Sequence, residues 1–129
     1  MLWSLLVAGA LASPVSLTAA DGVQLFADSK GSGDRGVLFL HANGRSHVDW
    51  QFFSEKLSQL GFRTLSLDLR GHGKSSPKDS LDEADYLAMP ADVKAGVAWL
   101  NKQGVKSITI VGAELGALAG LSAAAENSS

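Results

Sequence analysis

The chain of 129 residues contains no cysteine and has almost balanced charge, with 11 basic and 13 acidic residues. Without cysteine it forms no disulfide, no thiolate metal site and no lipid-modified cysteine anchor. The net charge of −2 gives no basic surface of the kind that nucleic acid or an anionic membrane attracts. We therefore expect neither a nucleic-acid partner nor a membrane partner. The length fits a single domain with one core.

Long hydrophobic runs are also scarce, and the one uncharged stretch of note is residues 1–12 at the N-terminus. It ends in Ala10-Leu11-Ala12, followed by Ser13-Pro14, which resembles the apolar region and cleavage site of a secretory signal peptide. It is too short to span a bilayer, and it lacks an early Lys or Arg. The pattern favours a signal peptide over residues 1–12 and a secreted or periplasmic protein. A misplaced start codon or a strand that packs on the domain, with a cytoplasmic location, is the alternative.

The remaining residues alternate between short strand-like and longer helix-like patterns. Strands are predicted at residues 15–19, 23–27, 36–40, 63–67 and 107–111, with an Asp21-Gly22 hairpin turn after the first. Helices are predicted at residues 49–60, from Pro90 to Gln103, and at residues 115–126. Polar loops are predicted at residues 29–35 and 71–83. This alternation predicts an α/β fold, with about five mostly parallel strands and helices on both faces of the sheet.

Helix faces can also be predicted. In the first helix Trp50, Phe53, Leu57 and Leu60 share one face, and in the second Val93, Val97 and Leu100 point inward. The third helix is so rich in Ala and Leu that both of its faces are expected to be buried.

The most informative motif is Gly112-Ala113-Glu114-Leu115-Gly116, which directly joins a β-branched strand to an alanine-rich helix. A sharp strand-to-helix turn forces its central residue towards positive φ, which is costly for a residue with a Cβ. Glycine two positions before and after that residue relieves the crowding. The pattern G-x-X-x-G in this setting is that of a nucleophile elbow, with Glu114 where serine is usual. Plain packing of a strand on a helix is the alternative.

Two further motifs accompany the elbow in the expected order. Residues 40–44, Leu-His-Ala-Asn-Gly, and residues 67–75, Leu-Asp-Leu-Arg-Gly-His-Gly-Lys-Ser, each follow a predicted strand. Together the three motifs resemble the N-terminal half of an α/β-hydrolase of the esterase or dienelactone hydrolase-like type. The resemblance covers residues 15–126, so that residues 13–129 would form the N-terminal portion of such a domain. Ala42 departs from the glycine usual in the oxyanion loop.

The resemblance implies a role for each matching residue. The backbone N–H groups of Asn43 and Leu115 would be the two donors of an oxyanion hole. His41 would support the oxyanion loop by hydrogen bonding, and Gly112 and Gly116 would shape the elbow. The parent activity would be hydrolysis of small-molecule esters or related acyl compounds, with no cofactor and no metal. The family's acid and histidine come later in chain order than the nucleophile; residues 117–129 contain no histidine and no counterpart of that acid.

Glu114 therefore has three interpretations. They are an inactive position, a carboxylate nucleophile, and a structural or ligand-binding acid. Epoxide hydrolases and haloalkane dehalogenases of this fold use Asp as the nucleophile, but Glu is one methylene longer and still needs a histidine for the second step. We favour a hydrolase-family chain that is catalytically incomplete. A non-catalytic module that binds a small molecule or a partner through the hydrolase cleft is the alternative.

The other polar residues of the motifs are predicted to be structural. His41 and His72 are expected to be loop histidines with satisfied hydrogen bonds, and His47 is expected to be exposed. The three histidines have no metal-ligand spacing. We predict an ion pair between Asp68 and Arg70, and no nucleophilic role for Ser75 or Ser76.

The last predicted strand, residues 107–111, has a second consequence. In the family's strand order it is an interior strand, paired on its far side by a sixth strand. Within this chain that side would be open, which favours self-association through the sheet edge.

Overall fold

The computed structural model describes residues 13–77 and 79–127. The predicted signal peptide of residues 1–12 lies outside the described residues and stays a prediction. Within the described part of the chain, no helix is both long and apolar enough to span a bilayer.

The described chain begins with the predicted hairpin. Strand β1 (Ser13–Thr18) pairs antiparallel with β2 (Gln24–Lys30), and Leu17 lies opposite Leu25. Gly22 has φ +90° in the turn, a backbone conformation that glycine adopts at little cost. The strand continues to Lys30, so the polar loop begins two residues later than the sequence predicts. The extra residues are held because Ser29 and Lys30 pair with β4.

Three parallel strands follow: β3 (Arg35–Leu40), β4 (Phe62–Leu67) and β5 (Ser107–Gly112). The sheet order is β1-β2-β4-β3-β5, with β3 parallel to both β4 and β5. Only β2 runs against the others, since it is antiparallel to both of its neighbours. The predicted α/β class with a five-stranded, mostly parallel sheet is confirmed.

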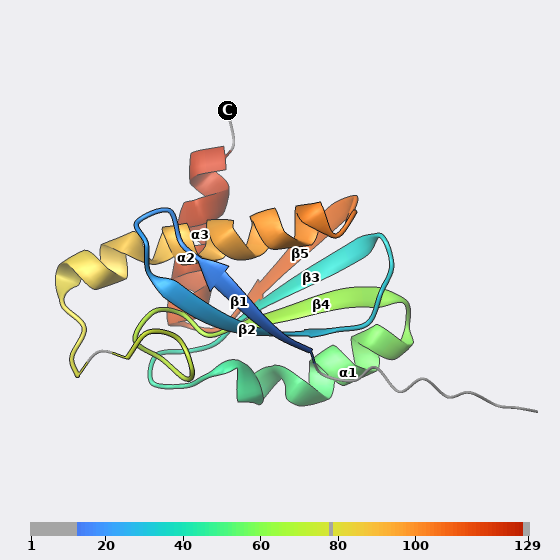
Figure 1. Ribbon diagram of the computed structural model, residues 1–129, viewed down its shortest axis with the longest axis horizontal. Coiled ribbons are helices and arrows are strands. Elements are labelled where there is room, and N and C mark those ends of the chain that lie inside the picture. Colours follow the sequence, from blue (N-terminus) through green and yellow to red (C-terminus); the bar gives the residue numbers. More distant parts are fainter. Residues whose placement is uncertain (1–12, 78, 128–129) are drawn as a thin grey trace, which may run out of the picture.

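Helices cover both faces of this sheet (Figure 1). A short 3₁₀ helix, η1 (His47–Trp50), leads into α1 (Gln51–Gln59) on one face, and α2 (Glu83–Lys102) and α3 (Leu115–Asn127) lie on the other. The predicted buried face of the first helix is wrong in part. Phe53 and Leu60 are exposed, and Ser54 is the buried residue of α1. The helix therefore touches the sheet along a narrower strip than its apolar residues indicate.

Helix α2 begins earlier than predicted. Asp82 caps it, and the Asp82 and Asp85 side chains each accept the other's backbone N–H in a capping box. Pro90 lies inside the helix and does not open it. The cap and the burial of Met89 and Val93 on either side outweigh the loss of one backbone donor at the proline.

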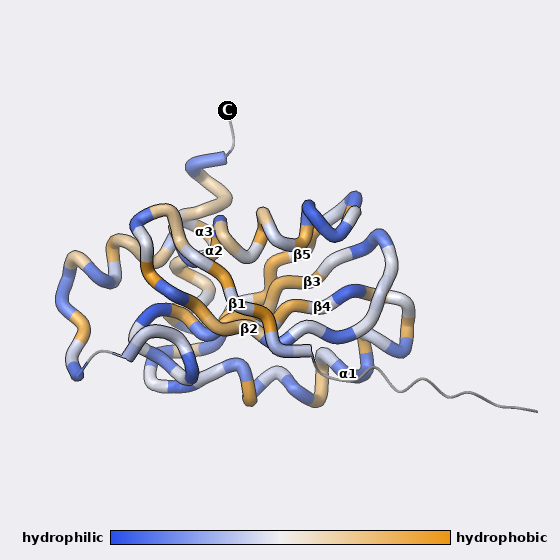
Figure 2. The backbone as a smooth tube through the Cα atoms, in the orientation of Figure 1, coloured by the Kyte–Doolittle hydropathy of each residue, from blue (hydrophilic) through white to orange (hydrophobic). Residues whose placement is uncertain are grey.

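The core lies between the sheet and the α2–α3 layer. The central strands contribute the fully buried residues Leu38, Leu40, Leu65 and Leu67. Hydrophobic residues are concentrated in the middle of the sheet (Figure 2). In α2, Val93 and Leu100 are buried as predicted.

Helix α3 is only partly covered, which corrects the prediction that both of its faces are buried. Gly116, Ala119, Gly120 and Ala123 pack inward, whereas Leu118 and Leu121 are 65% and 69% exposed. Within the described residues, nothing lies over this outer face.

Candidate active site

The turn between β5 and α3 has the backbone conformation that the elbow motif predicts. Glu114 has φ +49° and is the only residue other than glycine with positive φ in the described ranges 13–77 and 79–127. Its side chain is exposed. A left-handed conformation costs an ordinary residue roughly 1–2 kcal/mol, so the surrounding structure must hold it there. The turn therefore presents a side chain above the carboxyl end of the sheet.

The two glycines of the motif allow the close packing that holds the turn. A Cβ on Gly112 would lie 2.6 Å from the Ala117 nitrogen, and one on Gly116 would lie 2.4 Å from the Leu40 carbonyl oxygen and 2.6 Å from that of His41. These neighbours are backbone atoms and cannot rotate away. Any larger residue would push α3 off the sheet.

The turn also lies against the loop that follows β3. Leu40 and Gly112 are partners at the ends of adjacent parallel strands, and the Ala113 N–H donates to the Leu40 carbonyl at 3.1 Å. Leu115 is the first residue of α3, where a backbone N–H has no acceptor within the helix. Asn43 belongs to the neighbouring loop. The oxyanion role of Asn43 and Leu115 stays a prediction.

His41 joins the loops after β3 and β4. Its Nε2 accepts the Leu69 N–H at 3.0 Å, so the proton is on Nδ1, which donates to the Ala42 carbonyl at 2.8 Å. The ring is 1% exposed. Burial lowers the pKa of His41 below its ordinary value of 6.5, because a buried imidazolium loses its hydration. These contacts join the two loops, and the role of His41 in supporting an oxyanion loop stays a prediction.

His72 makes a second, similar connection. Its Nε2 accepts the Gly44 N–H at 2.9 Å, and its Nδ1 donates to the Arg70 carbonyl at 3.0 Å. The rings of His72 and His41 lie 4.9 Å apart. Both histidines are neutral in this arrangement and use both ring nitrogens, as the prediction of satisfied loop histidines requires.

His47 is buried, and the prediction that it is exposed is wrong. Its exposed fraction is 7%. Its backbone N–H donates to Asp68 Oδ1 at 2.6 Å, and its ring Nδ1 lies 2.9 Å from both carboxylate oxygens of Asp68. The ring also packs on Phe26, with centroids 5.0 Å apart. No hydrophobic period marks this position, because a polar partner from another loop buries it.

Asp68 is the centre of this cluster. It is fully buried, and besides His47 its carboxylate accepts the Lys74 N–H at 2.8 Å. A Cβ on Gly73 would lie 2.2 Å from the same carboxylate, so glycine is needed beside it. Ser75 donates its hydroxyl to the Asp68 carbonyl and accepts the Phe26 N–H. This hydroxyl is used structurally, and the absence of a nucleophilic role for Ser75 stays a prediction.

Arg70 does not pair with Asp68, so that prediction is wrong. Its guanidinium lies 2.6 Å from both Asp92 and Asp21, and Asp92 also accepts the Arg70 N–H at 2.9 Å. Burial opposes the charge, but the hydrogen bonds that the guanidinium donates to the two carboxylates raise the pKa of Arg70. Asp68 is bonded to His47 instead, and Arg70 to Asp92 and Asp21, so that each has its partner in a distant segment.

Sequence reasoning missed Asp92, which is fully buried. One signal was available. Asp92 stands beside the inward-facing Val93, and a charge at the buried face of a helix indicates a buried partner of opposite sign.

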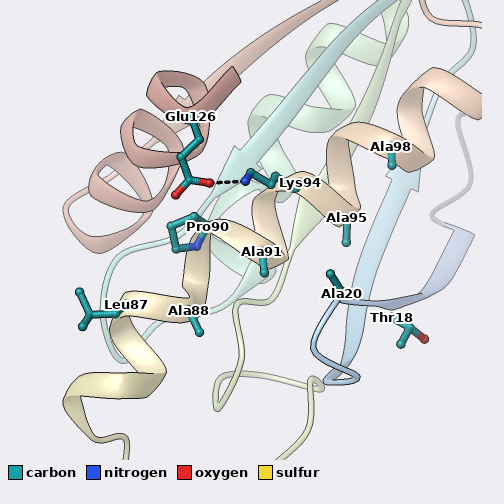
Figure 3. A pocket seen from close by; sticks show the side chains of 10 residues that line it. All are labelled: Thr18, Ala20, Leu87, Ala88, Pro90, Ala91, Lys94, Ala95, Ala98 and Glu126. Atoms are coloured by element: carbon teal, nitrogen blue, oxygen red, sulfur yellow. Dashed lines mark hydrogen bonds and ion pairs between the residues drawn. The ribbon is translucent and has the colours of Figure 1, made fainter. Parts of the chain in front are cut away.

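One hollow of the surface lies away from these loops. It has a volume of about 480 Å³ and runs along α2 beside the β1–β2 turn, with Thr18, Leu87 and the Lys94–Glu126 ion pair among its lining (Figure 3). Glu114 and the loops after β3 and β4 do not line it. In residues 13–77 and 79–127, no three His, Asp or Glu side chains are grouped closely enough to hold a metal ion.

Comparison with known sequences identifies relatives of this arrangement. A family model described as "alpha/beta hydrolase fold" matches residues 36–129. A non-heme haloperoxidase from Rhodococcus erythropolis is 36% identical over 100 residues, which is 78% of this chain and 34% of that protein. Bifunctional epoxide hydrolase 2 from Sus scrofa is 32% identical over 95 residues, which is 74% of this chain and 16% of that protein. The chain thus spans about a third or less of the length of these two relatives.

A solved structure shows the same fold. The Pyrococcus furiosus esterase Pf2001 superposes with a TM-score of 0.74 at 28% identity, over 95% of this chain and 50% of the esterase chain. Three observations support the same family: the strand order, the positive-φ turn before α3 and the family match over residues 36–129. The chain belongs to the alpha/beta hydrolase fold family.

Proposed function

We propose that the chain carries the elbow and the oxyanion loop of a small-molecule hydrolase, and that the polypeptide of residues 1–129 does not itself turn over esters. The observation that carries the proposal is Glu114, which occupies the positive-φ position of the elbow. A serine there would be the nucleophile of the parent ester hydrolysis. A carboxylate is a weaker nucleophile than an activated serine and a better leaving group than an alkoxide, so the adduct it forms with an ester carbonyl returns to the reactants.

The histidines support the proposal as well. His41 and His72 use both ring nitrogens in hydrogen bonds between loops, and His47 holds the buried Asp68. A general base must reach the nucleophile or its water with a free ring nitrogen. His41 and His72 have none to offer without breaking the connection between their loops.

A second candidate is a carboxylate nucleophile at Glu114. It is supported by the relatives named as epoxide hydrolases, because the family resemblance gives such enzymes Asp at this position. In that reaction a carboxylate oxygen attacks an epoxide carbon, the ring C–O bond breaks, and the alkoxide takes a proton. The product is an ester on the protein, which water and a histidine base must then cleave.

An ester assay tests the first candidate. We expect no saturable hydrolysis of p-nitrophenyl acetate by the chain, and none by Glu114→Ser, since a lone serine lacks a base. Glu114→Ala is the matched control. Saturable activity of the unchanged chain that disappears in Glu114→Ala would contradict the proposal.

Mass spectrometry after incubation with styrene oxide tests the second candidate. Without a base to release it, an ester on Glu114 would accumulate and raise the protein mass by one epoxide. We expect no such adduct at Glu114. An adduct that maps to this residue and is absent from Glu114→Gln would replace the first proposal by the second.

The type of parent enzyme, its substrate class and the export of the chain are further proposals. We propose an esterase or dienelactone hydrolase-like parent that acts on an ester-like small molecule, and export directed by residues 1–12. Secretion would leave a mature N-terminus at Ser13, which intact-mass measurement of the exported protein would detect. The alternative of a non-catalytic binding module predicts instead that small esters bind with no chemical change.

A further inference from the structure

His72 has one more polar neighbour than its neutral ring can bond. Its Nδ1 lies 3.0 Å from the Arg70 carbonyl, which only accepts, so the single proton of the neutral ring is on Nδ1. Nε2 then has one lone pair, to which the Gly44 N–H donates at 2.9 Å. The Asn43 Oδ1 lies 3.3 Å from the same Nε2 and, as an amide oxygen, can only accept. A proton on Nε2 would therefore bond to Asn43 and leave Gly44 without an acceptor.

Both neighbours of Nε2 belong to one tight turn. The Arg45 N–H donates to the Ala42 carbonyl at 3.1 Å. Gly44, the third residue of this turn, has φ +74°, and Asn43, the second, has no positive φ, so the turn is of type II. Types I and II differ in the orientation of the central peptide, which here joins Asn43 to Gly44. The bond from the Gly44 N–H to the histidine ring thus fixes one of two orientations of this peptide.

The turn has room for the other orientation. Asn43 and Gly44 are both exposed, and nothing lies within 4 Å of the place that a Cβ on Gly44 would occupy. Rotation of the central peptide carries the Gly44 N–H away from His72. It therefore separates the two N–H groups that a proton on Nε2 would bring face to face.

The surroundings of His72 allow it to take up this proton without its neighbour His41, whose ring centroid lies 4.9 Å away. Burial lowers the pKa of His41, and the charge of a protonated His72 lowers it further. Nε2 of His72 faces the exposed turn, whereas Nε2 of His41 holds the N–H of the buried Leu69. The other charged side chains of the two loops have partners elsewhere; these are Arg45, Asp49, Asp68, Arg70 and Lys74.

We propose that His72 is a positioning residue of the oxyanion loop, and that a proton on its Nε2 decides which of two conformations the loop adopts. The neutral ring holds the Gly44 N–H and keeps the turn in its type II form. The protonated ring donates to Asn43 Oδ1, and the central peptide rotates away from it. The proton comes from solvent. This role deepens the proposed function, on which it rests for the identity of the loop, because Asn43 is the residue that would supply one oxyanion donor.

Nuclear magnetic resonance of the isotope-labelled chain between about pH 8 and about pH 5, where histidine changes its charge, tests the proposal. When the His72 ring takes up its second proton, the protection of the Gly44 amide from hydrogen exchange should fall about tenfold, the loss of one hydrogen bond. The intrinsic pH dependence of exchange is corrected for. His72→Gln offers Gly44 a neutral acceptor, so its Gly44 amide should not respond to pH.

Two substitutions at the exposed Asn43 should move the midpoint of the Gly44 response in opposite directions. Asn43→Ala removes the acceptor of the protonated ring and should lower the midpoint by about half a pH unit. Asn43→Asp keeps an acceptor and adds a negative charge, so it should raise the midpoint by about as much. A histidine that only packs between the loops would give the same midpoint in both variants.

A His72 ring that takes up no proton in this range, or a Gly44 amide that keeps its protection afterwards, would overturn the proposal. So would a response that persists in His72→Gln, or a midpoint that neither Asn43 variant changes. Glu114→Ser should respond like the unchanged chain. These measurements contain no ester. Ester hydrolysis by the chain would therefore contradict the proposed function and leave the role of His72 intact, whereas a Gly44 amide that ignores pH would contradict the role of His72 alone.

Discussion

Two regions meet at the carboxyl end of the sheet and are held in different ways. The loops after β3 and β4 are joined by buried polar side chains, with Asp68, His41 and His72 each bonded to backbone groups of another segment. The β5–α3 elbow is held by backbone packing against glycine, and its one charged residue, Glu114, is exposed. The conformation of the first region depends on the hydrogen bonds of its side chains. The conformation of the second depends on the absence of a Cβ at Gly112 and Gly116.

The largest effect is expected from Asp68→Ala. The change leaves the buried His47 N–H without an acceptor and removes the partner of the Lys74 N–H. Removal of one member of such a buried pair costs about 3–5 kcal/mol of the free energy of unfolding. Urea denaturation would measure the loss. Asp49→Ala is the control, because Asp49 pairs with Arg45 at the surface and its removal should leave the stability nearly unchanged. Equal stability of the two variants would show that the polar cluster contributes nothing.

Gly116→Ala tests the elbow by adding a side-chain atom, whereas Asp68→Ala removes side-chain atoms. Its new Cβ would meet the Leu40 and His41 carbonyl oxygens, and such overpacking should cost ~3 kcal/mol. Gly120→Ala in the same helix meets only side-chain carbons of Ile110 and Leu40, at 3.0 and 3.2 Å. The better helix propensity of alanine should bring its effect close to zero. Thermal unfolding of the two variants compares them, and an equal loss in both would mean that backbone crowding does not hold the turn.

Glu114→Gly should stabilise the chain. Relief of the left-handed strain should add about 1–2 kcal/mol to the free energy of unfolding. The greater freedom of glycine in the unfolded chain offsets about 0.5–1 kcal/mol of this gain, so we expect a net gain of roughly 1 kcal/mol. Glu114→Ala keeps a Cβ and should show no gain. A loss of stability in Glu114→Gly, measured by urea denaturation, would mean that the glutamate side chain makes a contact that holds the turn.

The smallest effect concerns pH and the loop histidines. Because burial lowers the pKa of His41, the unfolded chain binds the proton more readily than the folded chain. Stability is therefore complete above the unfolded value of 6.5 and falls as the pH drops through it towards the folded pKa. His41→Gln keeps an acceptor for the Leu69 N–H but does not titrate.

Urea midpoints at about pH 7.5 and about pH 5.5, on either side of the ordinary histidine pKa, would measure this effect. His47 and His72 are present in both proteins. The difference between the two proteins in the change of urea midpoint with pH is therefore due to His41. A variant that loses as much stability on acidification as the unchanged chain would contradict the expected role of the buried ring.

Local patterns were sufficient to predict the strands and the elbow. Alternating short apolar runs and longer helical periods predicted all five strands to within a few residues, because strand formation here follows burial in a covered sheet. The spacing of Gly112, Glu114 and Gly116 predicted a positive φ, because no other backbone path turns from strand to helix so sharply. These properties depend on neighbours in sequence.

Contacts between distant segments were decided by the tertiary structure alone. The fold decides which loops and strands come together. The burial of His47, the pairing of Arg70 with Asp92 and Asp21, and the exposure of Leu118 and Leu121 on α3 depend on this. The sequence pattern around a polar residue does not indicate which residue it will bond to. The sequence of an apolar helix likewise does not show which of its faces a neighbour will cover. The amino-acid sequence determined where the chain turns and which strands form; the folded sheet decided which charges are paired and which polar side chains are buried.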